Sequence, residues 1–182
     1  HDLAGAYLLP GFIDVQVNGG DGIMFNDAPS IASLCQIVRA HRAFGTTGML
    51  PTIISDDMAV INGAMEATAR AKACDLPEVL GLHVEGPFIN PARSGVHDPA
   101  KFRELDADTV ALFTRFQAGK LLVTLAPERT NSAYLRQLAD AGVIVSAGHT
   151  NATCRDIQAS LRNGLSGFTH LFNAMSPLQS RE

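Results

Sequence analysis

The feature that most constrains the fold is a regular alternation of short apolar runs with longer amphipathic segments. Runs rich in β-branched or aromatic residues predict six buried strands, over residues 11–17, 47–54, 79–84, 121–126, 143–147 and 167–172. The segments between them carry apolar residues at helical spacing, such as Ile31, Leu34 and Val38. Strand and helix repeated in this order predict an α/β protein with a parallel sheet.

Residues that start and stop helices stand at the borders of these segments. The predicted N-cap residues are Ser30, Asp56, Asp106, Ser132 and Asn151. The glycines that follow predicted helix ends are Gly45, Gly119, Gly142 and Gly164. The longest irregular stretch, residues 88–103, follows the third predicted strand, and a loop of that length at a strand end is typical of a functional segment.

Two architectures fit this α/β pattern: a doubly wound open sheet and a (β/α)8 barrel of the TIM type. No glycine-rich phosphate loop of the GxGxxG or Walker kind follows any predicted strand. The polar residues suited to catalysis stand at the carboxyl ends of several different strands, which favours the barrel. Since a complete barrel takes about 250 residues, the sequence predicts a partial barrel of about six βα units.

Three potential metal ligands lie at predicted strand ends. Glu85 ends the third strand, His149 ends the fifth, and His170 lies in the sixth. In a closed barrel these ends surround one axis, so the three side chains can converge on one point. One carboxylate and two imidazoles form a set typical of catalytic zinc sites, which leave a position open for water. Each residue alone fits a hydrogen-bonding role at a loop, but the three together favour a metal centre.

Other polar residues near these strand ends allow more than one interpretation. His83 precedes Glu85 by two residues, so both face the same side of the strand, and His83 is expected to orient a ligand rather than bind metal. His97, in the long loop, fits a solvated histidine or a substrate contact equally well. Asp14 in the first strand is either a structural hydrogen-bonding group or a catalyst.

Charge and cysteine content exclude several classes of protein. A formal net charge of −4 gives no basic field for duplex nucleic acid or an anionic membrane. The three cysteines are scattered and form no CxxC pair, which predicts reduced thiols rather than a disulfide framework. No apolar run approaches the roughly 20 residues of a membrane-spanning helix. A cytoplasmic protein with a small-molecule ligand is the expectation.

Four segments stand out in order along the chain. They are PGFIDVQVNG at residues 10–19, HVEGP at 83–87, AGHTNA at 147–152 and THLFNAM at 169–175. Together with LAPE at 125–128, they resemble the N-acetylglucosamine-6-phosphate deacetylase family of the amidohydrolase superfamily. The resemblance runs through the whole chain. It implies a metal-dependent hydrolase barrel over residues 10–182, with residues 1–9 as the tail of a small β-domain.

The resemblance also implies a reaction and its site. The family hydrolyses the N-acetyl group of N-acetylglucosamine 6-phosphate, in amino-sugar catabolism, and releases glucosamine 6-phosphate and acetate. The positions that match its metal ligands are Glu85, His149 and His170. The positions that match its sugar-phosphate contacts are Val96, His97, Asn173, Ala174 and Arg181. Related members are homodimers, in which the matching arginine reaches the phosphate across the subunit interface.

The expected metal content is one divalent ion per active site. Many amidohydrolases carry a His-x-His pair in the first strand and bind two metals, and the matching positions here are Gln16 and Asn18. Neutral amides are poor ligands for a transition metal, so these residues are expected to support the ligands without binding the ion. Zinc leads among the metals that accept such a ligand set, with iron, cobalt and manganese as the others.

Part of the family's machinery has no match in the chain. The resemblance places the catalytic acid and base, an aspartate on the eighth strand, beyond Glu182, so the chain by itself is expected to be inactive or nearly so. The outer strands of six βα units would also leave open edges, where contacts with another chain are expected.

Two other functions are weighed against deacetylation. An amidohydrolase acting on a cyclic amide would favour the His-x-His pair that Gln16 and Asn18 replace, which lowers that option. A non-catalytic fragment that binds metal or a sugar phosphate would bind ligand without turnover.

Overall fold

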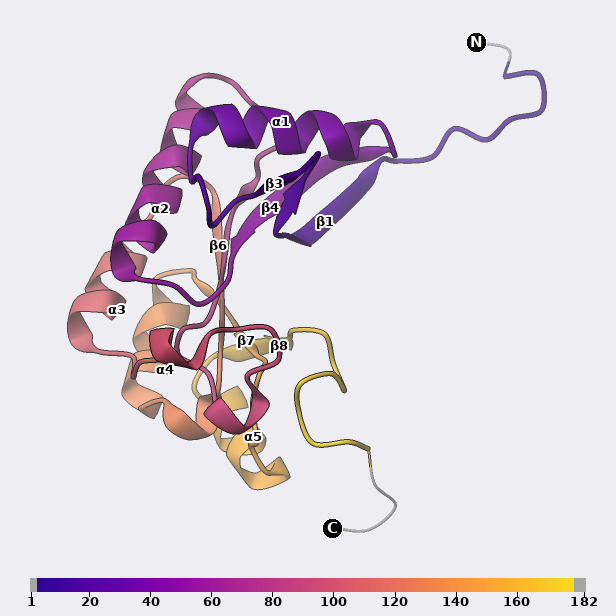
Figure 1. Cartoon of the computed structure of the whole chain (residues 1–182). Helices are drawn as coiled ribbons and strands as arrows, with labels where there is room; N and C mark the ends of the chain where they lie inside the picture. The colour runs from indigo at the N-terminus through magenta and orange to yellow at the C-terminus, as the bar shows by residue number, and fades with distance from the viewer. Residues whose placement is uncertain (1–2, 179–182) are drawn as a thin grey trace.

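A computed structural model of the chain describes residues 3–178. One sheet of six parallel strands crosses it, in the order β1–β4–β5–β6–β7–β8. The strands are β1 (Phe12–Val17), β4 (Thr46–Ile53), β5 (Gly81–Glu85), β6 (Lys120–Leu125), β7 (Ile144–Ala147) and β8 (Leu165–Phe168). Each pairs with the next long strand along the chain, without the reversal of order of a doubly wound sheet. The curled sheet (Figure 1) confirms a partial TIM-type barrel.

Helices connect the strands and lie along one side of the sheet (Figure 1). They are α1 (Ile31–Arg42), α2 (Met58–Ala73), α3 (Ala107–Thr114), α4 (Ser132–Asp140) and α5 (Cys154–Leu161). Three single turns of 3-10 helix follow strands: η1 (Pro91–Arg93), η2 (Pro99–Lys101) and η3 (Pro127–Arg129). A hairpin of β2 (Gly19–Gly20) and β3 (Ile23–Met24) follows β1. Within residues 3–178, no helix is both long and apolar enough to cross a membrane.

Five predicted strands are confirmed to within two residues, and the sixth ends earlier than predicted. The pairing of β8 with β7 stops where Phe168 lies opposite Ala147. Leu171 and Phe172, whose apolar character extended the predicted strand, are 51% and 59% exposed and lie in the following loop. The prediction that His170 lies within a strand is therefore wrong, because the residue sits just after the last paired position.

Helix boundaries follow the predicted pattern with small shifts. Ser30 and Asp106 are confirmed as N-caps, since each side chain accepts a backbone N–H of the first turn. The other three helices have N-caps at Asp57, Asn131 and Thr153 instead of Asp56, Ser132 and Asn151. Thr153 takes the position because it forms a capping box with Asp156. The four predicted end glycines, Gly45, Gly119, Gly142 and Gly164, all have positive φ.

The apolar core lies between the sheet and its helices. Alternate strand residues face the helices and are fully buried, among them Leu82 and Val84 of β5 and Val123 of β6. Leu34 of α1 and Phe113 of α3 belong to the same buried cluster. Because period-two alternation sends every second side chain the other way, His83, Thr124 and Ser146 lie on the inner face of the sheet.

The inner face carries a buried row of hydrogen-bonded side chains, here called the polar belt: Thr52, His83, Thr124, Ser146 and Thr169. His83 Nδ1 lies 3.3 Å from Thr52 Oγ1, and its Nε2 lies 2.8 Å from Thr124 Oγ1. Thr169 Oγ1 lies 2.6 Å from Thr124 Oγ1 and donates to Ser146 Oγ at 2.9 Å. The belt thus joins neighbouring strands from β4 to the end of β8, just below the rim where the strands end.

Candidate metal centre

The three predicted metal ligands meet above the polar belt. Glu85 is the last residue of β5, and His149 and His170 each lie two residues beyond their strands. Glu85 Oε1 is 3.2 Å from His149 Nε2 and 3.0 Å from His170 Nε2, and the two Nε2 atoms are 3.1 Å apart. Zinc–nitrogen bonds of 2.0–2.1 Å set tetrahedral ligand atoms about 3.3 Å apart. The three atoms are therefore spaced as ligands of one small cation.

The backbone at the two histidines turns their rings over the rim. His149 has φ of 48° and His170 has φ of 35°, both in the left-handed region that disfavours residues other than glycine. An extended backbone at these positions would continue the strand direction. The left-handed turn after each strand thus belongs to the arrangement that brings the rings to Glu85.

Hydrogen bonds fix which nitrogen of each ring carries its proton. His149 Nδ1 donates to the carbonyl of Arg93 at 2.7 Å, and His170 Nδ1 donates to the carbonyl of Asn173 at 3.0 Å. A carbonyl only accepts, so the neutral rings carry their hydrogen on Nδ1 and present a lone pair at Nε2. Metal-ligating histidines are typically oriented in this way. Two lone pairs and a carboxylate oxygen then face one another, an arrangement that a divalent cation stabilises.

The charges around Glu85 favour its ionised form. Burial opposes ionisation, but His149, which donates to the carboxylate when its ring is protonated, and the protonated forms of the nearby His83 and His97 hold the pKa of Glu85 at about 2 in the metal-free chain. The pKa of His149 is raised: burial lowers it, and the Glu85 carboxylate and the Arg93 carbonyl outweigh that effect. The carboxyl group is therefore ready to act as an anionic ligand at neutral pH.

The second oxygen of Glu85 is also held. Gln16 Nε2 donates to Glu85 Oε2 at 2.9 Å. Gln16, the first of the two amides expected to support the ligands, thus contacts Glu85 from outside the triangle of Glu85 Oε1, His149 Nε2 and His170 Nε2. Asn18 at the second position differs, since its Nδ2 is buried and has no hydrogen-bond partner among residues 3–178. Asp14 Oδ1 accepts the Gln16 N–H at 3.0 Å, which favours its structural interpretation over a catalytic one.

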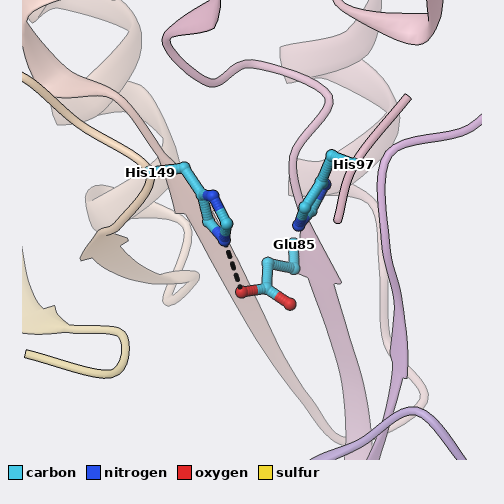
Figure 2. A group of neighbouring side chains, drawn as sticks. All are labelled: Glu85, His97 and His149. Carbon is cyan, nitrogen blue, oxygen red and sulfur yellow. Dashed lines mark hydrogen bonds and ion pairs between the residues drawn. The ribbon is translucent and has the colours of Figure 1, made fainter. Parts of the chain in front are cut away.

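His97 lies beside the triangle, but its ring hydrogen is on a different nitrogen from those of His149 and His170. Ligand atoms of Glu85, His97 and His149 lie within 4.8 Å of one another, and Figure 2 shows His97 approaching from the side opposite His149. His97 Nδ1 accepts the Ser55 backbone N–H at 3.2 Å and lies 2.7 Å from the Ser55 hydroxyl. Nδ1 therefore holds the lone pair, and Nε2 carries the hydrogen.

This proton position suits His97 to contact an oxygen atom of a ligand. Burial, with the charge of His149 next, lowers the pKa of His97 to about 4, so the ring is neutral near pH 7. The residue is 3% exposed, which excludes the solvated-loop interpretation. Gly86 permits the close approach of Ser55, because its φ is 75° and an added Cβ would lie 2.3 Å from Ser55 Oγ.

His83 occupies the layer below the ligands. Its ring is 1% exposed between two hydroxyl groups of the polar belt. Burial, the largest influence, lowers the pKa of His83 to about 4, although the Glu85 carboxylate acts in the opposite direction. The ring is neutral near pH 7 and hydrogen-bonds to Thr52 and Thr124. An orienting effect of His83 on Glu85 stays a prediction.

Four of the residues expected to contact a sugar phosphate, Val96, His97, Asn173 and Ala174, lie in two loops around the triangle. Val96, next to His97, is 86% exposed. The carbonyl of Asn173 orients His170, and the carbonyl of Ala174 accepts the Thr150 N–H at 3.2 Å. Arg181 lies outside the described residues. The assignment of these residues to a phosphate stays a prediction.

Two contributors to the site carry no recognisable signal in the sequence, and a third carries only a weak one. Ser55 and the carbonyl of Arg93 act through the proton positions of His97 and His149. Glu128 joins the loops around His149, and only its place in the LAPE segment drew attention to it. Backbone donors and acceptors are present at nearly every residue, so residue type cannot reveal which of them face a ring.

Comparison with known proteins gives a consistent group of relatives. The model of the amidohydrolase family matches residues 7–179. The chain is 44% identical over 180 residues to an N-acetylgalactosamine-6-phosphate deacetylase of Shewanella sp. (strain ANA-3), covering 99% of this chain and 46% of that protein. It is 36% identical to an N-acetylglucosamine-6-phosphate deacetylase of Haemophilus influenzae, covering 98% and 47%. The chain thus spans slightly less than half the length of these relatives.

Solved structures show the same likeness. The crystal structure of N-acetylglucosamine-6-phosphate deacetylase from Pasteurella multocida superposes with a TM-score of 0.90 at 34% identity, covering 94% of this chain and 45% of that one. The enzyme of the same name from Mycobacterium smegmatis gives a TM-score of 0.86 at 32% identity, with the same coverage. These scores mean that the curled six-strand sheet occurs in them with nearly the same backbone.

Proposed function

Because the chain belongs to the amidohydrolase family, we propose that it forms the metal-binding part of an enzyme that deacetylates N-acetylglucosamine 6-phosphate. The products are glucosamine 6-phosphate and acetate. The observation that carries the proposal is the triangle of Glu85 Oε1, His149 Nε2 and His170 Nε2, with both ring hydrogens on the far nitrogens. The names of the relatives support the choice of substrate.

Each residue of the centre has a separate task in this proposal. Glu85, His149 and His170 hold one divalent cation, with zinc first and iron, cobalt or manganese as the other candidates. Such an ion activates water and polarises the acetamide carbonyl. Gln16 holds the free oxygen of Glu85, and the Nε2–H of His97 donates to an oxygen of the substrate.

The remaining tasks fall to parts of the barrel around this centre. Asn173, Ala174 and Arg181, with Val96, bind the sugar phosphate. Proton transfer to the leaving amine needs a further acid, which the family resemblance assigns to an aspartate on a later strand. We also propose a homodimer in the cytoplasm, and residues 1–9 as the tail of a small β-domain. Tyr7 and Leu8 in that segment are 92% and 83% exposed, which leaves their side chains free for such packing.

A second substrate has a specific observation in its favour. The Shewanella relative, at 44% identity, is named for the galactosamine sugar, whereas the Haemophilus relative named for the glucosamine sugar is 36% identical. The two sugars differ only in the configuration at C4, and the acetamide and phosphate are the same. Both therefore fit the proposed chemistry, and an assay has to compare them.

Metal analysis of the chain tests the centre directly. The chelator-washed protein, reconstituted with zinc, should hold close to one ion per chain. Glu85→Gln, His149→Ala and His170→Ala should each lose that ion while remaining folded by circular dichroism. Retention of the ion by any of the three variants would remove that residue from the ligand set. A folded wild-type chain without metal would count against the centre in this chain.

A chimera tests the reaction. The chain would replace the matching segment of the Shewanella relative, and acetate release would be measured with both amino-sugar phosphates. Dihydroorotate would serve as the cyclic amide, and its ring opening to N-carbamoylaspartate would be measured separately. Acetate from the glucosamine substrate supports the proposal, and acetate from the galactosamine substrate alone supports the second candidate. Metal binding without turnover of any substrate would favour a purely binding role.

A further inference from the structure

Glu128 gathers hydrogen bonds from two loops that follow different strands. It lies in η3, directly after β6. Its Oε1 accepts Asn90 Nδ2–H at 2.9 Å and the Asn151 backbone N–H at 2.7 Å, and its Oε2 accepts the Thr150 hydroxyl at 2.5 Å. One carboxylate therefore ties the loop after β5 to the loop after β7.

Both of these loops control His149. Thr150 and Asn151 follow it directly along the chain, so their attachment to Glu128 restrains the backbone on one side of the ligand. From the other loop, the Asn90 N–H donates to the His149 carbonyl at 2.9 Å, and the Arg93 carbonyl accepts its ring Nδ1–H at 2.7 Å.

A further bond closes this arrangement. Arg93 Nε donates to Asn151 Oδ1 at 2.9 Å, so the residue that orients the ring is joined to the residue that Glu128 holds. The left-handed φ of 48° at His149 is an unfavourable conformation for a histidine, and such conformations persist where surrounding contacts impose them. The contacts that impose this one converge on Glu128.

The other histidine ligand has no comparable brace among the described residues. His170 donates its Nδ1–H to the Asn173 carbonyl, three residues along the same loop. None of the hydrogen bonds that Glu128 makes within residues 3–178 involves that loop directly. The loop is linked to Glu128 indirectly, through Thr150, whose N–H donates to the Ala174 carbonyl at 3.2 Å. An effect that passes through Glu128 should therefore be smaller at His170 than at His149.

We propose that Glu128 is a positioning residue of the metal centre, which keeps His149 Nε2 directed at Glu85 by holding the two loops around it. The proposal extends the function proposed above. It rests on that function for what the positioning achieves, which is metal binding. The restraint itself acts on the chain without metal. Outer residues that orient a metal ligand typically change metal affinity by about 10- to 100-fold when replaced.

The test compares three variants in the metal-free and metal-bound chain. Glu128→Ala removes all three acceptor contacts. Glu128→Gln keeps an oxygen but places an amide N–H₂ among groups that donate, so its effect should be intermediate. Glu66→Ala is the matched control, because Glu66 is exposed on α2. Circular dichroism and urea unfolding establish that each variant is folded.

Heteronuclear NMR of the imidazole nitrogens in the metal-free protein is the first measurement. At a pH where the rings are neutral, wild type and Glu66→Ala should show His149 with its hydrogen on Nδ1. Glu128→Ala should show a mixture of both tautomers at His149 and a smaller change at His170. Zinc affinity, by competition with a chelator, should fall about 10- to 100-fold in Glu128→Ala and less in Glu128→Gln.

Two results would overturn the proposal: an unchanged His149 tautomer in Glu128→Ala, or zinc affinity equal to wild type. If Glu128→Ala does not fold, the same measurements on Glu128→Gln decide, since that change removes only the charge and part of the acceptor capacity. A wild-type chain that binds no zinc would contradict the metal centre, while the NMR comparison would still decide whether Glu128 positions the ring.

Discussion

The inner and outer strands of the sheet differ in how completely they are covered. All five residues of β5 are buried, whereas β1 leaves Phe12 and Ile13 70% and 67% exposed. The proposed metal centre spans this difference. Side chains of Glu85 and His149, at inner strands, are 3% and 6% exposed, while that of His170, beyond the outer strand β8, is 22% exposed. Two of its proposed ligands thus follow fully packed inner strands, and the third follows a more open outer strand.

The largest expected effect is a difference between inner and outer strands in how much a substitution lowers the free energy of unfolding. Leu82→Ala on β5 removes a fully buried core side chain and should lower the free energy of unfolding by about 2–5 kcal/mol. Ile13→Ala on β1 should change it by less than about 0.5 kcal/mol. Urea unfolding measures both. Similar losses in the two variants would mean that the exposed side of β1 is covered in solution, and a dependence on protein concentration would identify a second chain as the cover.

The next effect concerns the polar belt on the inner face. Thr124→Val removes the hydroxyl that lies between His83 Nε2 and Thr169 Oγ1. The buried His83 Nε2 then loses its partner, while Thr169 keeps its bond to Ser146. The free energy of unfolding should fall by about 1–3 kcal/mol. Thr47→Val, at the single exposed position of β4, is the matched control, with little change expected. Equal stability of both variants would contradict a stabilising role of the belt.

The smallest effect is a pH dependence of the free energy of unfolding, caused by His83 on the inner face of the sheet. The pKa of His83 is about 4 in the folded chain and 6.5 ordinarily, so below pH 6.5 the unfolded chain binds a proton that the folded chain does not. Stability therefore falls as pH decreases from 6.5 towards 4, by about 1.4 kcal/mol per pH unit for this group. His83→Gln should lose about 1.4 kcal/mol less than wild type between pH 7.5 and 5.5. Equal losses in urea titrations at the two pH values would contradict the neutral, buried state of His83.

The fold was largely readable from the sequence, because buried parallel strands are continuous apolar runs. The exception was the end of the sixth strand. Leu171 and Phe172 have the composition of a strand but lie exposed in a loop, and an apolar run does not reveal where its partner strand stops. The sequence does not predict the hairpin of β2 and β3, because two-residue strands are too short to show alternation.

The sequence predicts which side chains lie close together at the strand ends, but not where their protons lie. Glu85, His149 and His170 could be selected because they stand at strand ends that a barrel brings together. Whether a ring offers a lone pair or a hydrogen depends on the Arg93 carbonyl and the Ser55 N–H, which no sequence pattern marks. His97 therefore remained open between two interpretations until its burial and its partner were known.

The left-handed backbone at His149 and His170 has a consequence for how such a sequence can change over generations. Glycine would adopt φ of 48° or 35° without strain, so on folding stability alone it is the favoured residue at both positions. Under the proposed function, imidazoles there serve ligand chemistry at a cost in stability, the trade-off common at functional sites. Descendants of this chain released from selection for that chemistry should drift towards glycine at these two positions first, while the buried residues of β5 stay as they are.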